Sequence, residues 1–218
     1  NGDFSTFLGA PPVVPDVLEL IWRKFATDEQ RAKLEKFVPT EYNALYMVDP
    51  NGDVREEFYA KRHLVPFGEY VPLRRLIEII CPPLLRISQL SGDTTPGKDA
   101  AVFDSPVGNI GSLICFDSIY EQLAYDSARH GAELLCISTN DSWFFDSAAV
   151  HMHNAQARLR AIETGRFVVR AANTGVSSVI SATGRELARI DALEEGILTF
   201  SVELRSDRTL YTRIGNWF

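Results

Sequence analysis

Apolar strands and helices alternate between residues 107 and 171, and this alternation constrains the fold more than any other feature. Val107–Cys115 has the pattern of a strand, and Ser118–His130 that of a helix ended by a glycine. Leu134–Ser138 is a short apolar run typical of a buried strand. A second helix, Ala148–Thr164, is also closed by a glycine and precedes the strand Phe167–Ala171. Strand–helix–strand units of this kind predict an α/β layered fold.

The rest of the chain is divided into shorter elements. Asn43–Val48 and Phe58–Lys61 are expected to form a hairpin, because the Asn-Gly pair between them is a strong turn signal. Four further elements are expected: a strand at Phe7–Ala10, a helix at Val17–Phe37, and strands at Val176–Ser181 and Ile197–Glu203, the last followed by a polar tail.

Composition excludes several classes of protein. The 218 residues are 45% hydrophobic and 23% charged, which fits one large globular domain or two small ones. The net charge of −7 makes binding to nucleic acid unexpected. Three cysteines are too few for a disulfide scaffold and match no zinc motif. No apolar run approaches the ~18 residues of a membrane span, and no signal peptide is visible.

Cys115 is the candidate nucleophile, because it stands where a strand meets the following helix. At such a junction the side chain points at the helix N-terminus, whose partial positive charge favours the thiolate. The next backbone N–H could stabilise an oxyanion. The alternative is a buried, inert thiol, the commonest state of a free cysteine. Cys136, inside an apolar run, and Cys81, beside a proline, are expected to be packing residues.

Lys61 and Glu69 are the candidate charged partners of the nucleophile. Lys61 ends a strand and is followed by apolar residues and two prolines that fix the path of the chain. A lysine beside a thiolate can keep it ionised and donate to a developing oxyanion, and a carboxylate can orient the lysine or move protons. The alternative is that both residues are exposed ends of a strand and a loop.

Four segments carry motifs in a recognisable order: Tyr59–Pro72 (YAKRHLVPFGEYVP), Leu113–Asp117 (LICFD), Ser138–Phe144 (STNDSWF) and the stretch from His153 through Arg158–Gly175. Together they resemble the apolipoprotein N-acyltransferases, a family within the nitrilase (carbon–nitrogen hydrolase) superfamily. The tail Thr209–Trp217 is similar to the end of that family's extracytoplasmic domain. The match covers nearly the whole chain, and four motifs in register are far more specific than any one.

The resemblance implies a nitrilase-like α-β-β-α sandwich, an α/β fold, as a single domain over residues 1–218 that is partial at its N-terminus. It implies that Cys115 is the nucleophile, Lys61 its partner and Glu69 a supporting glutamate. It implies no cofactor and no metal. His151 and His153, two apart on a predicted helix, face different sides, which also argues against a shared metal.

The same resemblance implies a reaction and its partners. An acyl chain moves from a phospholipid donor to the cysteine, forming a thioester, and then to the N-terminal amine of a lipidated apolipoprotein. The implied location is the bacterial inner membrane, with the catalytic domain facing the periplasm and membrane helices supplied by the parent protein.

The expected substrate contacts lie next to the catalytic residues. Phe116 and Asp117 follow the nucleophile where the family usually has Tyr and Glu, so substrate fit is expected to differ while the chemistry is kept. Asn140, Asp141 and Trp143 follow a buried strand, where α/β folds commonly place the walls of a site. Loop capping is the alternative for these three residues.

The family's general-base glutamate has no match in this sequence. It is expected upstream of the strand at Phe7–Ala10, so we expect a piece cut inside the catalytic domain and inactive alone. Two other functions stay open: a soluble nitrilase-type amidohydrolase that uses water as acyl acceptor, and a catalytically dead nitrilase-like binding domain.

Leu73–Leu90 is apolar, contains interleaved arginines and is broken by Pro82-Pro83. Such a composition is typical of a bent arm that lies in lipid headgroups, with arginines reaching the phosphates. The alternative is that these residues pack on the domain's own core. An arm predicts exposed side chains at Leu76, Ile80, Leu84 and Leu85, and a core segment predicts buried ones.

Overall fold

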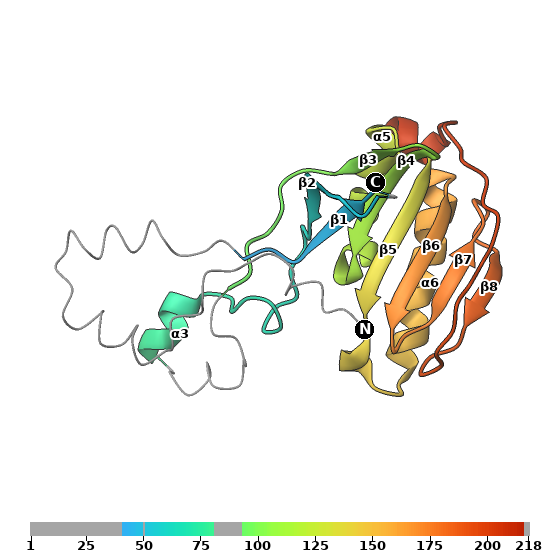
Figure 1. Cartoon of the computed structure of the whole chain (residues 1–218). Coiled ribbons are helices and arrows are strands. Elements are labelled where there is room, and N and C mark those ends of the chain that lie inside the picture. The colour runs from blue at the N-terminus through green and yellow to red at the C-terminus, as the bar shows by residue number, and fades with distance from the viewer. Residues whose placement is uncertain (1–40, 50, 81–92, 216–218) are drawn as a thin grey trace.

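The computed structural model describes residues 41–49, 51–80 and 93–215, and its main body is a six-stranded sheet (Figure 1). In their order across the sheet, the strands are β3 (Val102–Ser105), β4 (Gly108–Ile114), β5 (Leu134–Asn140), β6 (Phe167–Asn173), β7 (Ser177–Ile180) and β8 (Glu186–Ile190). The strand expected at Phe7–Ala10 and the helix expected at Val17–Phe37 lie outside the described residues.

The three central strands run parallel, and this arrangement gathers their ends. β4 pairs with β5 and β5 with β6 in parallel, whereas β3, β7 and β8 are antiparallel to their neighbours. Ile114 at the end of β4 pairs with Ser138, which in turn pairs with Ala171. The residues that follow β4, β5 and β6 therefore lie together at the carboxyl ends of these parallel strands, where α/β proteins commonly bind ligands.

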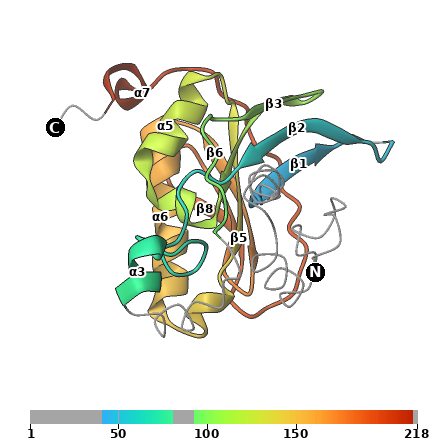
Figure 2. The same cartoon turned by 90° about the vertical axis from the view of Figure 1, so that its left-hand side faces the viewer.

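Two longer helices, α5 (Glu121–Arg129) and α6 (Ala148–Thr164), cover one face of this sheet (Figure 2). The core between sheet and helices is apolar: Leu113, Leu123, Ala124, Ala132, Leu135, Ile137, Ala157, Ala161, Val168 and Ile180. The chain leaves each helix through a glycine in the left-handed region, Gly131 at φ 97° and Gly165 at φ 65°. The glycine stops expected from the sequence are thus confirmed.

A two-stranded hairpin lies on the other side of the large sheet. It consists of β1 (Ala44–Val48) and β2 (Val54–Ala60), joined by the expected turn (Figure 2). Tyr59 of the hairpin packs with Phe103 and Ile114 of the large sheet. The helices, the large sheet and the hairpin form successive layers, as expected for an α-β-β-α sandwich.

A short helix, α3 (Arg74–Ile80), follows the hairpin and carries exposed apolar side chains at Leu76, Ile79 and Ile80. The exposure of Leu76 and Ile80 agrees with the arm, while Leu84 and Leu85 lie outside the described residues. In the part of the chain that the structure describes, no helix combines the length and apolar character that crossing a membrane requires.

The structure corrects several boundaries. Ile197–Glu203 is not a strand: it has no regular structure, Ile197 is almost fully exposed, and Leu198 and Val202 are only partly buried. The edge of the sheet is instead formed by β8, which was not expected. The polar tail contains a helical turn, α7 (Leu210–Ile214), whose first turn is capped by the Thr209 hydroxyl. The helix expected from Ser118 begins three residues later, because a 3₁₀ turn precedes it.

Candidate active site

Cys115 begins a tight turn directly after β4. Its φ is 47°, in the left-handed region that few residues other than glycine adopt, and it opens the 3₁₀ turn Cys115–Ile119 that leads into α5. The Ser118 hydroxyl donates to the Cys115 carbonyl at 2.8 Å. The strand–turn–helix position expected for the nucleophile is therefore present, and the cysteine is half-buried rather than enclosed.

Lys61 and Glu69 form an ion pair. The ammonium of Lys61, which is 2% exposed, donates to Glu69 Oε2 at 2.7 Å. The same carboxylate accepts from Val65 N at 2.8 Å and from Asn43 Nδ2 at 2.9 Å, which fixes its orientation. Exposed strand and loop ends would not show this pattern, and a buried ammonium with one oriented partner is suited to act on a neighbouring substrate.

Asp117 connects the lysine loop to the nucleophile turn. Its side chain is fully buried and accepts four hydrogen bonds. Oδ1 accepts from the backbone N–H groups of Arg62 and His63, and Oδ2 accepts from Tyr59 Oη and from Ile114 N. Burial raises the pKa of this carboxyl, while the hydrogen bonds from His63 N and Tyr59 oppose that rise. All four bonds go to groups of this chain, so the structure gives Asp117 a role in holding the loop and the turn together.

Phe116 is partly exposed and stands against an aromatic group. Its ring meets the edge of Tyr120 at 5.5 Å between centroids, and Tyr120 stacks on His63 at 4.0 Å. His63 belongs to the loop that carries Lys61, so these rings link the two sides of the candidate site. Substrate contact by Phe116 stays a prediction.

The three residues expected to form a wall after β5 have different environments. Trp143 is 70% exposed, and Asn140 is exposed, with its side-chain Oδ1 accepting from Ser142 N. Asp141 is fully buried, and Thr139 Oγ1 donates to its Oδ1 at 2.8 Å. Asn140 and Trp143 are thus available to a ligand in this structure, whereas Asp141 faces the interior.

Asp141 belongs to a buried polar network that the sequence did not reveal. Its Oδ1 lies 2.9 Å from His153 Nδ1 on α6, and its Oδ2 accepts from Arg170 Nη2 on β6 at 2.6 Å. Burial alone would raise the pKa of Asp141, but the hydrogen bond with His153 and the charge of Arg170 outweigh it and lower the pKa. Arg170 could have been noticed as a charge at an inward position of an apolar strand, the same face as Val168.

The network also contains a set of atoms that could bind a metal. Among the described residues, Cys115, Asp141 and His153 place sulfur, oxygen and nitrogen ligand atoms within 4.8 Å of one another. Both Asp141 oxygens and both ring nitrogens of His153 already have partners, and the buried guanidinium of Arg170 would repel a cation. This donor set is therefore committed to the protein itself.

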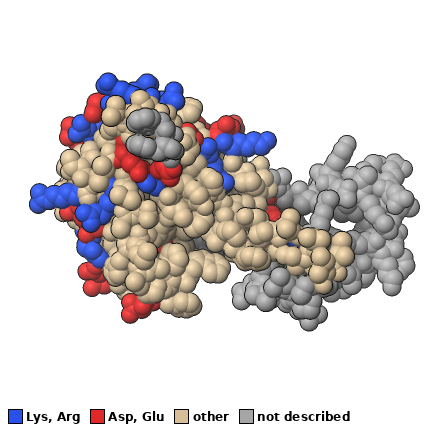
Figure 3. Space-filling view, turned by 180° about the vertical axis from the view of Figure 1, so that it is seen from behind, with Lys and Arg blue, Asp and Glu red and all other residues tan. Residues whose placement is uncertain are grey.

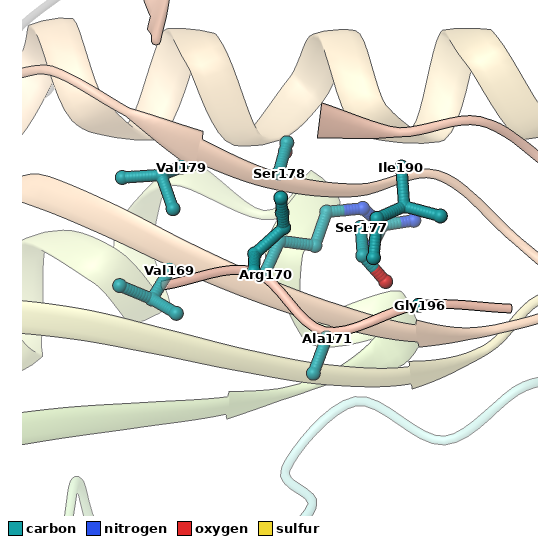
Figure 4. Close-up of a pocket in the computed structure, with 9 residues that line it drawn as sticks. Val169, Arg170, Ala171, Ser177, Ser178, Val179, Ile190 and Gly196 are labelled. Atoms are coloured by element: carbon teal, nitrogen blue, oxygen red, sulfur yellow. The ribbon is translucent and has the colours of Figure 1, made fainter. Parts of the chain in front are cut away.

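An open cavity of about 190 Å³ lies elsewhere on the sheet (Figure 4). It is lined from β6, β7, β8 and the segment after them, and in Figure 4 Val169 and Ala171 point to one side of the sheet and Ser178 to the other. Only Arg170 is shared with the residues described above, and Cys115, Lys61 and Glu69 do not line this cavity.

Comparison with known proteins identifies the family. The family model for carbon–nitrogen hydrolases matches residues 25–210. The apolipoprotein N-acyltransferase of Geobacter metallireducens is 37% identical over 178 residues, which are 81% of this chain and 33% of that protein. The enzyme of the same name from Methylococcus capsulatus is 39% identical over 161 residues, 73% of this chain and 31% of that protein. The chain thus spans about a third of the length of these relatives.

Solved structures support the fold. A variant of an amidase from Nesterenkonia sp. AN1, described with acrylamide added at its active-site cysteine, has a TM-score of 0.56 at 19% identity, covering 79% of this chain and 59% of that one. A carbon–nitrogen hydrolase from Helicobacter pylori has a TM-score of 0.52 at 19% identity, covering 71% and 54%. These likenesses show the fold, and the family model matched over most of the chain shows that it belongs to the carbon–nitrogen hydrolase family, the nitrilase superfamily.

Proposed function

We propose that this chain carries the catalytic cysteine of an N-acyltransferase that moves an acyl chain from a phospholipid to the N-terminal amine of a lipidated apolipoprotein. The observation that carries the proposal is the turn at Cys115 together with the buried Lys61 and its partner Glu69, in a chain whose curated relatives are named for this activity. Supporting it, Asp117 joins the loop of Lys61 to the turn of Cys115.

The first half-reaction forms a thioester. The Cys115 thiolate attacks the ester carbonyl of the phospholipid, a C–S bond forms, and the C–O bond breaks as the lysophospholipid oxygen takes up a proton. Negative charge develops on the carbonyl oxygen during the attack. The ammonium of Lys61 and the backbone N–H of Phe116 are the donors proposed to stabilise it.

The second half-reaction releases the acyl chain. The apolipoprotein amine attacks the thioester, a C–N bond forms, the amine loses a proton, and the C–S bond breaks to return the thiolate. Glu69 keeps Lys61 oriented throughout, because Asn43 and Val65 hold the carboxylate from two sides. The proton of the free thiol passes to a general base supplied by the intact protein.

Exposed apolar side chains near the candidate site suit a lipid donor. They are Phe67, Leu73, Leu76, Ile79 and Ile80 on one segment and Trp143 and Phe145 on another. In Figure 3 the described part of the surface that projects toward the right, drawn in tan, carries few charged side chains. We propose that this surface faces the periplasmic side of the bacterial inner membrane.

Amide hydrolysis is the second candidate, because the solved neighbours include amidases of the same fold. The same cysteine would form the same thioester, and water would then replace the amine as acceptor. A binding domain without activity is the third. The acyl acceptor, amine or water, separates the acyltransferase from the amidohydrolase. Reactivity of Cys115 toward an acyl donor separates both enzymes from a binding domain.

The test uses the intact natural protein in membranes or detergent, with a phospholipid and a diacylated lipopeptide. Wild type is expected to add one acyl chain to the lipopeptide amine, detected by mass spectrometry, and a trapped thioester is expected on the peptide that contains Cys115. Cys115→Ala is expected to abolish both signals, and Cys136→Ala is the matched control, because Cys136 lies in the sheet and burial raises the pKa of its thiol.

The outcomes discriminate between the candidates. Acyl transfer that survives Cys115→Ala would remove the assignment of the nucleophile. Hydrolysis of simple amides without transfer to the lipopeptide would favour the amidohydrolase. The 218-residue chain alone is expected to show no turnover in either assay.

A further inference from the structure

We propose that His153 is a positioning residue for Cys115, and that Asp141 and Arg170 hold its ring in place from behind. The proposal rests on the proposed role of Cys115 as nucleophile, but it assigns a function to three buried side chains that the acyl-transfer chemistry does not use. The contacts run from Arg170 to Asp141, to His153 and to Cys115. These four residues lie on four different elements: β6, the end of β5, α6 and the turn after β4.

The atom that needs to be held is the carbonyl oxygen of Cys115. A non-glycine residue with φ of 47° stores strain, and such a conformation persists only where surrounding contacts over-determine it. Two side chains meet this carbonyl: Ser118 Oγ donates to it at 2.8 Å, and His153 Nε2 lies 3.2 Å away. The same ring nitrogen lies 3.0 Å from Ser118 Oγ, so the three groups form one cluster. The single hydroxyl hydrogen of Ser118 goes to the carbonyl, and a carbonyl oxygen only accepts, so Nε2 takes part in this cluster as an N–H donor.

The opposite nitrogen fixes the direction in which the ring points. His153 Nδ1 lies 2.9 Å from Asp141 Oδ1, and a carboxylate only accepts, so Nδ1 carries a proton toward it. This pairing of one nitrogen sets the plane of the imidazole and therefore the place of the other nitrogen beside Cys115. Phe144 packs its ring edge against the imidazole at 5.8 Å, which limits the remaining rotation.

Asp141 is held on its other oxygen by Arg170. The Arg170–Asp141 bond is 2.6 Å long, and both side chains have no exposed surface. Pairs buried in this way are costly unless geometry is good, and removing one partner leaves an uncompensated charge. Within the described residues, Arg170 Nε and Nη1 have no hydrogen-bond partner, so most N–H donors of the guanidinium are buried without an acceptor. A purely structural role would be served better by an apolar side chain at this inward position.

The Arg170 guanidinium belongs to a network that lies next to the Cys115 thiol. Cys115 Sγ lies within 4.8 Å of an Asp141 oxygen and a His153 nitrogen, so the network borders the thiol itself. Burial lowers the pKa of Arg170, while the charges of Asp141 and of the Cys115 thiolate act to raise it. Arg170 thus places a buried positive charge behind the side chains that border the thiol.

Two substitutions of His153 separate positioning from packing. An asparagine amide can replace the Nδ1 group toward Asp141 but does not reach Cys115, whereas a glutamine amide can replace Nε2 beside the Cys115 carbonyl. We therefore compare His153→Asn with His153→Gln in the intact natural protein. The readout is the rate of alkylation of Cys115 by iodoacetamide between pH 6 and 9, measured on its own peptide by mass spectrometry, with the thermal midpoint of each variant.

His153→Asn is expected to slow alkylation of Cys115 at least about fivefold, the size of one lost hydrogen bond at the turn, and His153→Gln is expected to stay within about twofold of wild type. His151→Asn and His151→Gln are the matched controls, because His151 is exposed on the same helix two residues earlier. Both controls are expected to alkylate as wild type does.

Equal rates for His153→Asn and His153→Gln, whether both unchanged or both slowed, would overturn the proposal, because a packing role treats the two amides alike. If His153→Asn does not fold, Ser118→Ala decides instead, since it removes the other contact of the Cys115 carbonyl. An unchanged alkylation rate in Ser118→Ala would then overturn the proposal. None of these measurements uses a lipid substrate, so they are independent of whether the chain is an acyltransferase.

Discussion

Removing the Asp117 carboxylate is expected to destabilise this fold more than any other single change near the site. Four donors from three parts of the chain end on it: Tyr59 Oη, the N–H groups of Arg62 and His63, and Ile114 N. In Asp117→Ala all four lose their acceptor inside the protein, where water does not replace it.

The magnitude follows from the contacts. Four hydrogen bonds at about 1 kcal/mol each suggest a loss of about 4 kcal/mol. The raised pKa of Asp117 shows that burying its charge is itself unfavourable, so the net cost is expected to be about 3 kcal/mol. Asp117→Asn keeps one acceptor oxygen for Arg62 N and His63 N, and Tyr59 can accept from the new amide. Only the bond to Ile114 N is then lost, and we expect about 1 kcal/mol.

The assay is the free energy of unfolding from urea titrations of the intact natural protein, with Tyr59→Phe as the control that removes a single donor. The expected order of stability is wild type, then Tyr59→Phe and Asp117→Asn, then Asp117→Ala. A loss below about 1 kcal/mol for Asp117→Ala would refute the argument that this carboxylate joins the loop to the turn.

Three further outcomes are expected. The lowered pKa of Asp141 means that its carboxylate stabilises the fold above about pH 4, and that this stabilisation is lost as the pH falls further. The thermal midpoint of Asp141→Asn should therefore fall less steeply with decreasing pH than that of wild type. Gly175→Ala would place a Cβ in steric conflict with Asp141 Oδ2 and is expected to cost about 2 kcal/mol in unfolding free energy. Ile79→Glu and Ile80→Glu are expected to raise KM for phospholipid with kcat unchanged, and unaltered KM values would contradict lipid contact by α3.

Most of the large sheet and its two helices could be predicted because local signals agree there. α6 has the predicted bounds, and the closing glycine, Gly165, marks its end in the structure as it does in the sequence. β8 was missed because it is only five residues long, contains two charged residues, and pairs with β7 through a short hairpin rather than through a strong apolar pattern. Ile197–Glu203 has the alternation of a strand but no partner strand among the described residues, so pattern alone gave the wrong result.

For the site, the sequence indicated the reactive groups but not the groups that hold them. Cys115 and Lys61 were found from their places at strand ends and Glu69 from its place in the loop after Lys61, and the structure pairs the last two. Asp141 also follows a strand and was predicted to contact substrate, yet its side chain turns inward to Arg170. No local signal distinguishes an inward from an outward carboxylate at the end of a strand, because the choice depends on a residue about 30 positions away.

The two buried carboxylates explain how a strained turn can be held between layers of the fold. Asp117 fastens the turn toward the hairpin side, through Tyr59 and the loop after β2. His153 and Asp141 fasten it toward α6 on the other face of the sheet. Strain at Cys115 would relax if either side yielded, since the left-handed conformation survives only when contacts from several directions agree. A nucleophile fixed in this way spends little free energy on ordering when substrate arrives, which is the benefit that preorganised sites provide.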